Sequence, residues 1–167
     1  MIPERIETDH LIFERLTHET IDLFDLYEIW SSDPGIEEVT EYLPWDPHTT
    51  PKETHDLLEE AEANWEVKED FCYILRIPGS SEPAIVGITG IDVHWGRGLS
   101  EERAAVLTEL VFETLDLDLL AVFTLEENQR SQRAIEKYID RYDGQYDGLF
   151  RNFRPHNGTL QMLTDTL

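Results

Sequence analysis

A pair of glycines lies between a run of residues that predicts a strand and a run that predicts a helix. Gly96 and Gly98 flank Arg97, and Ser100 follows at a position where it would cap the helix. Glycine allows a sharp turn and a close approach to a ligand, and the free amides of the first helical turn point toward that ligand. These amides and the helix dipole favour an anion, and phosphate above all. The alternative is a turn that needs glycine only for its own geometry.

The basic residues are concentrated in the same part of the chain. Eight of the thirteen lie between positions 97 and 154: Arg97, Arg103, Arg130, Arg133, Lys137, Arg141, Arg151 and Arg154. The glycine pair is not a P-loop, because no Gly-Lys-Ser/Thr follows it, and not a dinucleotide fingerprint, because the third glycine is missing. The sequence therefore favours a phosphate-bearing ligand at the glycine pair.

Apolar periodicity and turn residues predict the elements that would hold the glycine pair. We expect helices over residues 23–30, 51–65, 100–111 and 128–138. We expect strands over residues 11–15, 71–77, 84–93, 119–125, 145–153 and 160–163. The order β-α-α-β-β-α-β-α-β-β predicts an α/β fold, a mixed sheet with helices on both faces, in a single domain spanning residues 1–167.

Three of these segments carry a specific expectation. Thr50, Pro51 and Glu53 predict a helix start, with threonine as the cap, proline at the first helical position and glutamate reaching back. The continuous apolar run at 119–125 is typical of a strand buried on both faces of a sheet. The Asn-Gly pair at 157–158 predicts the turn of a hairpin.

A longer motif surrounds the glycine pair and ends at the start of the last predicted helix. It consists of Trp95, Gly96, Arg97, Gly98, Leu99 and Ser100, then Glu102, Arg103 and Ala104, an apolar strand, and finally Asn128 and Ser131. This succession resembles the GCN5-related N-acetyltransferases (GNAT), and within them the branch that acetylates the N-termini of ribosomal proteins. Residues 6–11 resemble the first strand of that branch, with His10 where arginine is usual. The Tyr-Leu-Pro-Trp segment at 42–45 resembles its substrate loop.

The resemblance implies a GNAT-like sheet, mostly antiparallel, and acetyl-CoA as the co-substrate. It implies that the segment from Trp95 to Ser100 cradles the pyrophosphate of acetyl-CoA through its backbone amides. It also implies that Asn128 and Ser131 contact the coenzyme, and that Ser131 is the acid that reprotonates the CoA thiolate. The reaction would be direct attack of a neutral amine on the thioester.

The chain departs from the family's pattern in three places. Val93 stands where the pyrophosphate motif usually opens with glutamine or arginine, and Ile135 stands where the wider family often has a catalytic tyrosine. The family also has a β-hairpin before the glycine loop, whose second strand splays from its neighbour to admit the pantetheine arm. Only twelve residues separate Pro83 from Gly96, so either both strands of this hairpin are very short or one is absent.

The sequence does not identify a single general base. Asp92 and His94 alternate on one face of a predicted strand and lie closest to the glycine pair, so they are the first candidates. The alternative is an ordinary pair of side chains facing solvent. Glu38 and Glu41, beside the predicted substrate loop, are further candidates in a chain where carboxylates are common.

Composition excludes several classes of partner. Thirty-six acidic residues against thirteen basic ones give a formal charge of −23, which argues against nucleic acid and against an anionic membrane surface. Only three of the cations are lysine: Lys52, Lys68 and Lys137. This balance indicates adaptation to concentrated salt, the alternative being an ordinary acidic protein. Seventeen aromatic residues are too many for a disordered chain.

The remaining residues indicate a protein without disulfide or metal. Cys72 is the only cysteine, so there is no intramolecular disulfide. The N-terminal residues do not resemble a signal peptide and no run resembles a membrane helix, so we expect a cytoplasmic protein. No metal site is expected either, because the histidines outside the strand motif are scattered: His10, His18, His48, His55 and His156.

Three functions are compatible with these residues. The leading hypothesis is an acetyl-CoA-dependent N-acetyltransferase acting on a primary amine, either a protein N-terminus or a small molecule. The rival is a non-catalytic relative that has lost a strand of the hairpin and binds CoA or a partner protein. A lost strand would expose a sheet edge, which a homodimer would cover. The third is an unrelated acidic α/β module.

Overall fold

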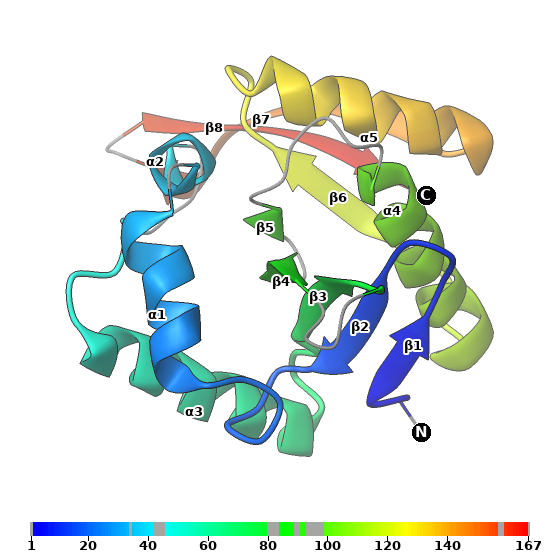
Figure 1. Ribbon diagram of the computed structural model, residues 1–167. Helices are drawn as coiled ribbons and strands as arrows, with labels where there is room; N and C mark the ends of the chain where they lie inside the picture. Colours follow the sequence, from blue (N-terminus) through cyan, green and yellow to red (C-terminus); the bar gives the residue numbers. More distant parts are fainter. Residues whose placement is uncertain are drawn as a thin grey trace. The chain divides into compact units, whose positions relative to one another are not determined.

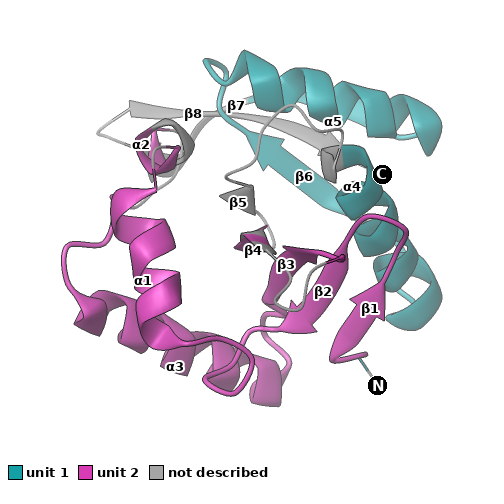
Figure 2. Cartoon of the chain, viewed as in Figure 1, with its two compact units in different colours: residues 1–2, 42–44, 98–167 teal, residues 3–41, 45–97 magenta. Residues whose placement is uncertain are grey.

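The computed structural model describes residues 2–33, 35–41, 46–79, 84–88, 91–92, 99–156 and 159–166 (Figure 1). The chain divides into two compact units (Figure 2). One consists chiefly of residues 3–41 and 45–97, and we call it the N-terminal unit. The other consists chiefly of residues 98–167, and we call it the C-terminal unit. Each unit combines helices with an antiparallel sheet, so the predicted α/β class is confirmed.

The N-terminal unit contains a five-stranded antiparallel sheet in the order β1-β2-β3-β4-β5. Its strands are β1 (Arg5–Glu7), β2 (Ile12–Arg15), β3 (Tyr73–Ile77), β4 (Ala84–Ile88) and β5 (Ile91–Asp92). Its helices are α1 (Leu23–Ser32), α2 (Ile36–Thr40) and α3 (Pro51–Val67). The largest fully buried side chains of this unit include Phe13 and Tyr73 from the sheet, Trp30 from α1 and Leu58 from α3. Burial of these apolar surfaces is the main stabilising term.

Side chains that accept hydrogen bonds from backbone amides fix where α1 and α3 begin. The Asp22 carboxylate accepts from the amides of Phe24 at 2.8 Å and Asp25 at 3.3 Å. At α3 the Glu53 carboxylate reaches back and accepts from the amide of Thr50 at 3.2 Å, as the sequence predicts. Pro51 is the first helical residue. These contacts satisfy amides that have no acceptor inside the helix.

The hairpin before the glycine pair is present and short. Strand β4 pairs with β5, with Gly87 opposite Asp92 and Ile88 opposite Ile91. Strand β5 is only two residues long. Both strands of the hairpin are present, β4 with five residues and β5 with two in the described part of the chain, so the alternative that one strand is absent is wrong.

The C-terminal unit contains a three-stranded antiparallel sheet in the order β6-β8-β7. Its elements are α4 (Leu99–Glu109), the π-helix η1 (Leu110–Thr114), β6 (Ala121–Thr124), α5 (Gln129–Arg141), β7 (Gln145–His156) and β8 (Thr159–Thr166). Helix α5 packs on β6 and β8 and buries Ile135 and Ile139. Strands β7 and β8 pair as the predicted hairpin, whose turn at 157–158 lies outside the described residues.

Five expectations need correction. Helix α4 begins at Leu99, so Ser100 lies inside the helix and does not precede it as a cap. Strand β6 is an edge strand with exposed Ala121 and Phe123 and buried Thr124, so it is not buried on both faces. Residues 8–11 form a turn between β1 and β2, and helix α2 was not expected. Within the described ranges the strands pair into two sheets, whereas the sequence predicts one.

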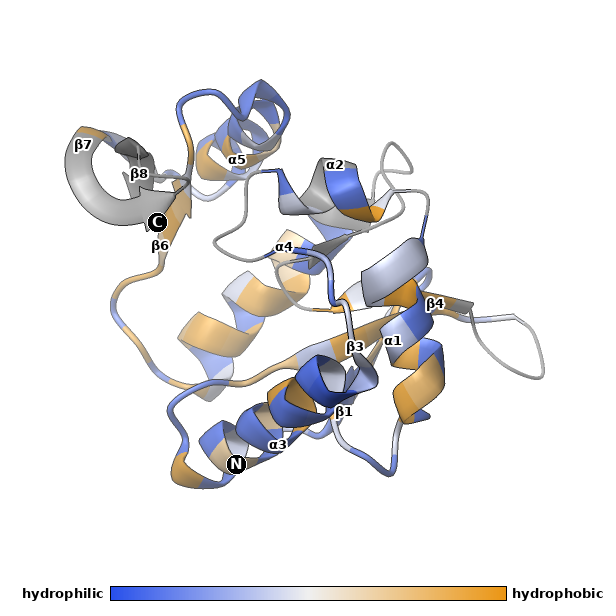
Figure 3. Cartoon of the chain, turned by 90° about the vertical axis from the view of Figure 1, so that its left-hand side faces the viewer, coloured by the Kyte–Doolittle hydropathy of each residue, from blue (hydrophilic) through white to orange (hydrophobic). Residues whose placement is uncertain are grey.

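Polar and apolar residues alternate along the helices. Figure 3 shows α3 and α5 as largely hydrophilic ribbons with hydrophobic segments between the polar ones. Such alternation is typical of helices with one face against a core and one face in water. Across the described part of the chain, none of the helices has both the length and the apolar character needed to cross a bilayer.

Candidate functional site

The glycine pair itself lies outside the described residues. The same holds for all of residues 93–98, which include His94, Trp95, Gly96, Arg97 and Gly98, and for the Tyr-Leu-Pro-Trp segment at 42–45. The described part resumes at Leu99, where α4 begins. Leu99 follows Gly98 in the sequence, and the amides of the first turn of a helix have no acceptor within the helix.

The first turn of α4 also carries negative charge. Glu101 and Glu102 lie in this turn. The Glu101 carboxylate accepts a hydrogen bond from Nη1 of Arg141, at the end of α5, at 3.0 Å. Both side chains are more than half exposed, at 57% and 54%, so the pair contributes less than about 1 kcal/mol to stability. Its effect is to place a cation beside the acidic first turn of α4.

Arg103 provides a buried donor close to the start of α4. Its Nη1 is inaccessible to water and has no hydrogen-bond partner among the residues that the structure describes. A buried donor left without a partner costs about 1–3 kcal/mol. An anionic ligand would remove that cost. Arg103 belongs to the basic group noted in the sequence, but its burial could not be predicted from sequence.

Asn128 and Ser131 lie together at the start of α5. Asn128 is the N-cap, and its side-chain oxygen accepts a hydrogen bond from the Ser131 amide at 3.0 Å. This is a capping contact, so the side-chain oxygen of Asn128 already has a structural role. The Ser131 side chain is half-buried, and its hydroxyl has no partner within the described part of the chain.

The loop before α5 is held by hydrogen bonds to its carbonyls. The Asn128 amide donates to the carbonyl of Leu125 at 3.0 Å. From inside the helix, Nε2 of Gln132 donates to the carbonyl of Leu125 at 3.2 Å and to that of Glu126 at 2.6 Å. The sequence analysis did not identify Gln132, whose role is to fix the loop that positions Asn128 and Ser131.

Helix α5 displays cations along one side. They are spaced three and four residues apart, which places them on one helical face, and all are exposed: Arg130, Arg133, Lys137 and Arg141. The helix has only two carboxylates, Glu136 and Asp140. In a chain with a net charge of −23 this is a local excess of positive charge. It lies in the same unit as α4.

The candidates for the general base are not brought together among the described side chains. Asp92 lies in β5 opposite Gly87, and its side chain is outside the described part, as is the whole of His94. Glu38 lies in α2 with its side chain also outside the described part. Glu41 is exposed at the end of α2.

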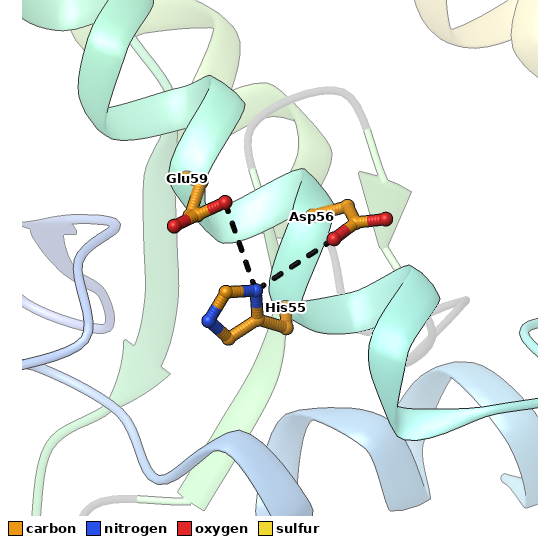
Figure 4. A group of neighbouring side chains, drawn as sticks. All are labelled: His55, Asp56 and Glu59. Carbon is orange, nitrogen blue, oxygen red and sulfur yellow. Dashed lines mark ion pairs between the residues drawn. The ribbon is translucent and has the colours of Figure 1, made fainter.

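His18 and His55 are far apart in the sequence but lie side by side in the fold. The rings of His18 and His55 are 5.2 Å apart, centre to centre. Figure 4 shows His55 with its ion-pair partners Asp56 and Glu59. The histidines are scattered in the sequence, as the sequence analysis states, but the fold brings these two together. The spacing of His55 and Glu59 by four residues was the local signal of this group, whereas the approach of His18 depends on the tertiary fold.

His48 contacts side chains of the N-terminal unit's core. Its Nδ1 lies 2.8 Å from the hydroxyl of Thr54, and its ring packs edge-on against Trp30 at 5.1 Å. Burial lowers the pKa of His48 below its ordinary value. The neutral ring suits this partly buried place beside α1.

Comparisons with known structures show the fold. A GCN5-related N-acetyltransferase from Brucella melitensis superposes with a TM-score of 0.70 at 19% identity, covering 100% of this chain and 80% of that chain. The ribosomal-protein-S5-alanine acetyltransferase from Vibrio fischeri superposes at 0.72 with 12% identity, covering 98% and 95%. A GNAT-family acetyltransferase from Bacillus anthracis superposes at 0.72 with 18% identity, covering 98% and 97%. The predicted GNAT-like fold is confirmed.

A search of curated protein sequences found no match to this chain. The model of the acetyltransferase (GNAT) domain family, however, matches residues 10–138. The matched segment includes the glycine pair, α4, Asn128 and Ser131. The match excludes the hypothesis of an unrelated acidic α/β module. The chain belongs to the GNAT acetyltransferase family.

Proposed function

We propose that this protein is an acetyl-CoA-dependent N-acetyltransferase that acts on a primary amine, and that residues 1–167 form one acetyltransferase domain. The observation that carries the proposal is helix α4, which is described from Leu99, the residue that follows the glycine pair in the sequence, in a chain of this family. First-turn amides at that place suit a pyrophosphate. The superpositions that cover 98–100% of the chain support the single domain.

Arg103 supports the choice of a phosphate-bearing co-substrate. Its buried Nη1 has no partner among the described residues and lies in the helix that starts at the glycine pair. A guanidinium donates well to phosphate oxygens. We assign the backbone from Trp95 to Ser100, through Gly96, Arg97, Gly98 and Leu99, to the pyrophosphate, with Arg103 as an additional donor.

Bound acetyl-CoA supplies an acetyl group activated as a thioester, which a neutral amine attacks directly. The chain's own part is to remove a proton from the acceptor's ammonium group and to return one to the leaving sulfur. We assign the first task to Asp92 or His94, on the strand that leads to the glycine pair, with Glu38 and Glu41 as alternatives. We assign the second task to the Ser131 hydroxyl, which regains its proton from water.

Ser131 suits this role because of how it is held. Its amide donates to the Asn128 cap, and Gln132 fixes the preceding loop, so the backbone that carries the hydroxyl is held in place. A positioned donor is more effective than one that must be ordered during the reaction. A Ser131→Ala variant should therefore lower kcat and leave the binding of acetyl-CoA nearly unchanged.

The rival function is a relative that binds the coenzyme or a partner protein without catalysis. One observation favours it: β5, the strand that leads to the glycine pair, is only two residues long. Because this strand is short but present, a non-catalytic function would have to result from its shortness and not from its absence. Binding without turnover would distinguish it from the enzyme.

The test is titration calorimetry with acetyl-CoA. We expect saturable binding by the wild type, no binding by Gly98→Trp, and unchanged binding by Val67→Trp, which places the same side chain on an exposed position at the end of α3. Arg103→Gln should weaken binding at least tenfold, whereas Arg5→Gln, in the other unit, should not. A folded wild type that fails to bind acetyl-CoA would refute the proposal, and binding without thiol release on any amine would favour the rival.

For the acceptor we propose a protein N-terminus, with small-molecule amines as the second class. Support comes from the similarity in fold to the ribosomal-protein-S5-alanine acetyltransferase of Vibrio fischeri. Thiol release should therefore depend on peptides with a free N-terminus and disappear when the same peptides are N-terminally blocked. Faster turnover of small amines than of any peptide would refute this choice.

We also propose that the acidic surface reflects adaptation to concentrated salt, and that the protein forms a homodimer through the β5 edge of its sheet, although no strand of the hairpin is lost. The support is the charge of −23 and the two-residue β5 at the edge of its sheet. The melting temperature should rise between dilute and molar KCl, because screening weakens the repulsion among carboxylates. Light scattering in molar salt should give twice the mass of one chain, and a monomer would exclude the dimer.

A further inference from the structure

Three neighbouring side chains on α3 present one nitrogen and two carboxylates to the same space. His55 Nδ1 lies 3.7 Å from an oxygen of Asp56 and 3.8 Å from an oxygen of Glu59 (Figure 4). One ligand atom from each residue lies within 4.8 Å of the other two. The side chains are 44%, 54% and 66% exposed, so each can still rotate.

These atoms have the chemistry and nearly the spacing of a zinc site. Zinc binds imidazole nitrogen and carboxylate oxygen at about 2.0–2.2 Å, so ligand atoms in a tetrahedral site are about 3.4 Å apart. The distances from Nδ1 of His55 to the two carboxylate oxygens, 3.7 and 3.8 Å, are close to that value, and all three ligand atoms lie within 4.8 Å of one another. Imidazole as a ligand favours a transition ion over Mg²⁺ or Ca²⁺, which prefer oxygen alone.

His18 approaches this group from the turn that follows β2. Its ring centre is 5.2 Å from that of His55, and the two rings are inclined at 63°. Its Nδ1 lies 3.0 Å from the Glu62 carboxylate, and the same oxygen accepts from the His18 amide at 2.7 Å. These contacts fix the position of the ring beside α3.

Glu62 also determines which nitrogen of His18 is available. One oxygen of the Glu62 carboxylate accepts a hydrogen bond from the His18 amide and lies within hydrogen-bond distance of Nδ1 of the same residue. A carboxylate oxygen accepts hydrogen bonds and does not donate them. The hydrogen therefore resides on Nδ1 of His18, and the neutral ring has its lone pair on Nε2. A carboxylate behind a histidine in this way is the usual arrangement behind a metal ligand.

We propose that His55, Asp56, Glu59 and His18 bind one divalent transition ion, with zinc as the best match. The bound ion would join the turn at residues 17–20 to α3 and so stabilise the N-terminal unit. This inference does not depend on the acetyltransferase function. It departs from the sequence analysis, which expects no metal site because His18 and His55 are far apart along the chain.

Lys52 competes with the ion. Its ammonium group forms an ion pair with the other carboxylate oxygen of Asp56, one helical turn away. Removing this cation frees Asp56 and reduces repulsion of a divalent ion. The variant Lys52→Gln should therefore bind zinc more tightly than the wild type.

The test is calorimetric titration of the full chain with Zn²⁺ in excess Mg²⁺, which occupies sites that consist of carboxylates alone. We expect one Zn²⁺ per chain. His55→Asn and His18→Asn should each weaken binding at least tenfold, and Glu62→Gln about tenfold, as for other residues behind a metal ligand. The control is His10→Asn, since the turn at 8–11 and His18 lie at opposite ends of β2. Zn²⁺ should also raise the melting temperature of the wild type but not that of His55→Asn.

Several results would overturn the site. These are the absence of saturable Zn²⁺ binding in excess Mg²⁺, equal weakening by His10→Asn and His55→Asn, or a His18→Asn variant that binds as the wild type does. Circular dichroism of each variant confirms that it is folded before it is compared. A tighter Lys52→Gln complex supports the site in a variant that keeps every proposed ligand.

Discussion

Helix α3 in the N-terminal unit and helix α5 in the C-terminal unit both begin at a side chain that accepts hydrogen bonds from backbone amides. In α3 the acceptor is the charged carboxylate of Glu53, and in α5 it is the neutral amide oxygen of Asn128. Both helices bury a short apolar face, with Leu58 in α3 and Ile135 in α5. The two helices are thus similar in the acceptors that cap their first turns and in the apolar side chains that they bury.

The solvent faces of these two helices carry charges of opposite sign. Helix α3 carries six carboxylates and one lysine, whereas α5 carries four cations and two carboxylates. Repulsion among like charges destabilises both helices, so neither pattern is explained by helix stability. The acidic pattern of α3 is that of the chain as a whole, and the basic pattern of α5 is the exception. We therefore connect the charge of α5 with a ligand and that of α3 with the solvent, apart from the histidine group.

The largest effects should come from the buried faces, where the two helices are alike. Leu58→Ala in α3 and Ile135→Ala in α5 remove side chains that are 0% and 2% exposed. Each should lower the free energy of unfolding by about 2–5 kcal/mol, through lost burial and the cavity left behind. Urea denaturation followed by circular dichroism measures the change in midpoint. An Ile135→Ala variant within about 0.5 kcal/mol of the wild type would show that α5 is not stabilised by its packing on β6 and β8.

The caps should give a smaller effect that distinguishes the helices by pH. Hydrogen bonds from the amides of Thr49 and Thr50 lower the pKa of Glu53 below its ordinary value. A carboxyl with a lowered pKa stabilises the fold above its unfolded pKa, and that contribution is lost as the pH falls through the folded pKa. The difference in melting temperature between wild type and Glu53→Gln should therefore be present at pH 7 and vanish in strong acid.

Two variants sharpen this test. Glu60→Gln, which removes an exposed carboxylate of α3 that has no backbone hydrogen bond in the described part of the chain, is the matched control. Asn128→Ala should cost about 1 kcal/mol at every pH, because an amide cap does not titrate. Asn128→Asp should retain the cap and transfer the pH dependence to α5. A difference for Glu53→Gln that stays constant from pH 7 to strong acid would contradict the assigned role of the carboxylate.

Features determined within a few residues could be predicted from the sequence, and those determined by tertiary packing could not. The cap of α3 and the start of α5 at Asn128 depend on contacts over three residues, and both predictions are confirmed. Strand β6 has the apolar run of a central strand, but its position at a sheet edge depends on which strands pair with it. The same holds for the division of the strands into two sheets.

The candidate site shows the same division. The sequence predicts that Asn128 and Ser131 lie at one helix start, and the structure places them 3.0 Å apart through a hydrogen bond. The burial of Nη1 of Arg103 and the hydrogen bond from Gln132 to the Leu125 carbonyl depend on how α4 and the loop at 125–128 pack. No short-range sequence pattern predicts that packing. The meeting of His18 and His55 joins segments 37 positions apart and required the folded chain.

The smallest effects should come from reversing one charge on each solvent face, and they test the connection between charge and ligand. Glu60→Lys in α3 places a cation four residues after Asp56, and Lys137→Glu in α5 places a carboxylate four residues from both Arg133 and Arg141. Each new pair stabilises a helix by about 0.2–0.5 kcal/mol, so both variants should melt slightly higher than the wild type in dilute salt. Acetyl-CoA binding should separate them: Lys137→Glu should bind more weakly, by a factor that shrinks as salt is added, whereas Glu60→Lys should bind as the wild type does. Equal binding by the two variants would mean that the cations of α5 do not serve the ligand, and the contrast between the two helices would then be one of composition alone.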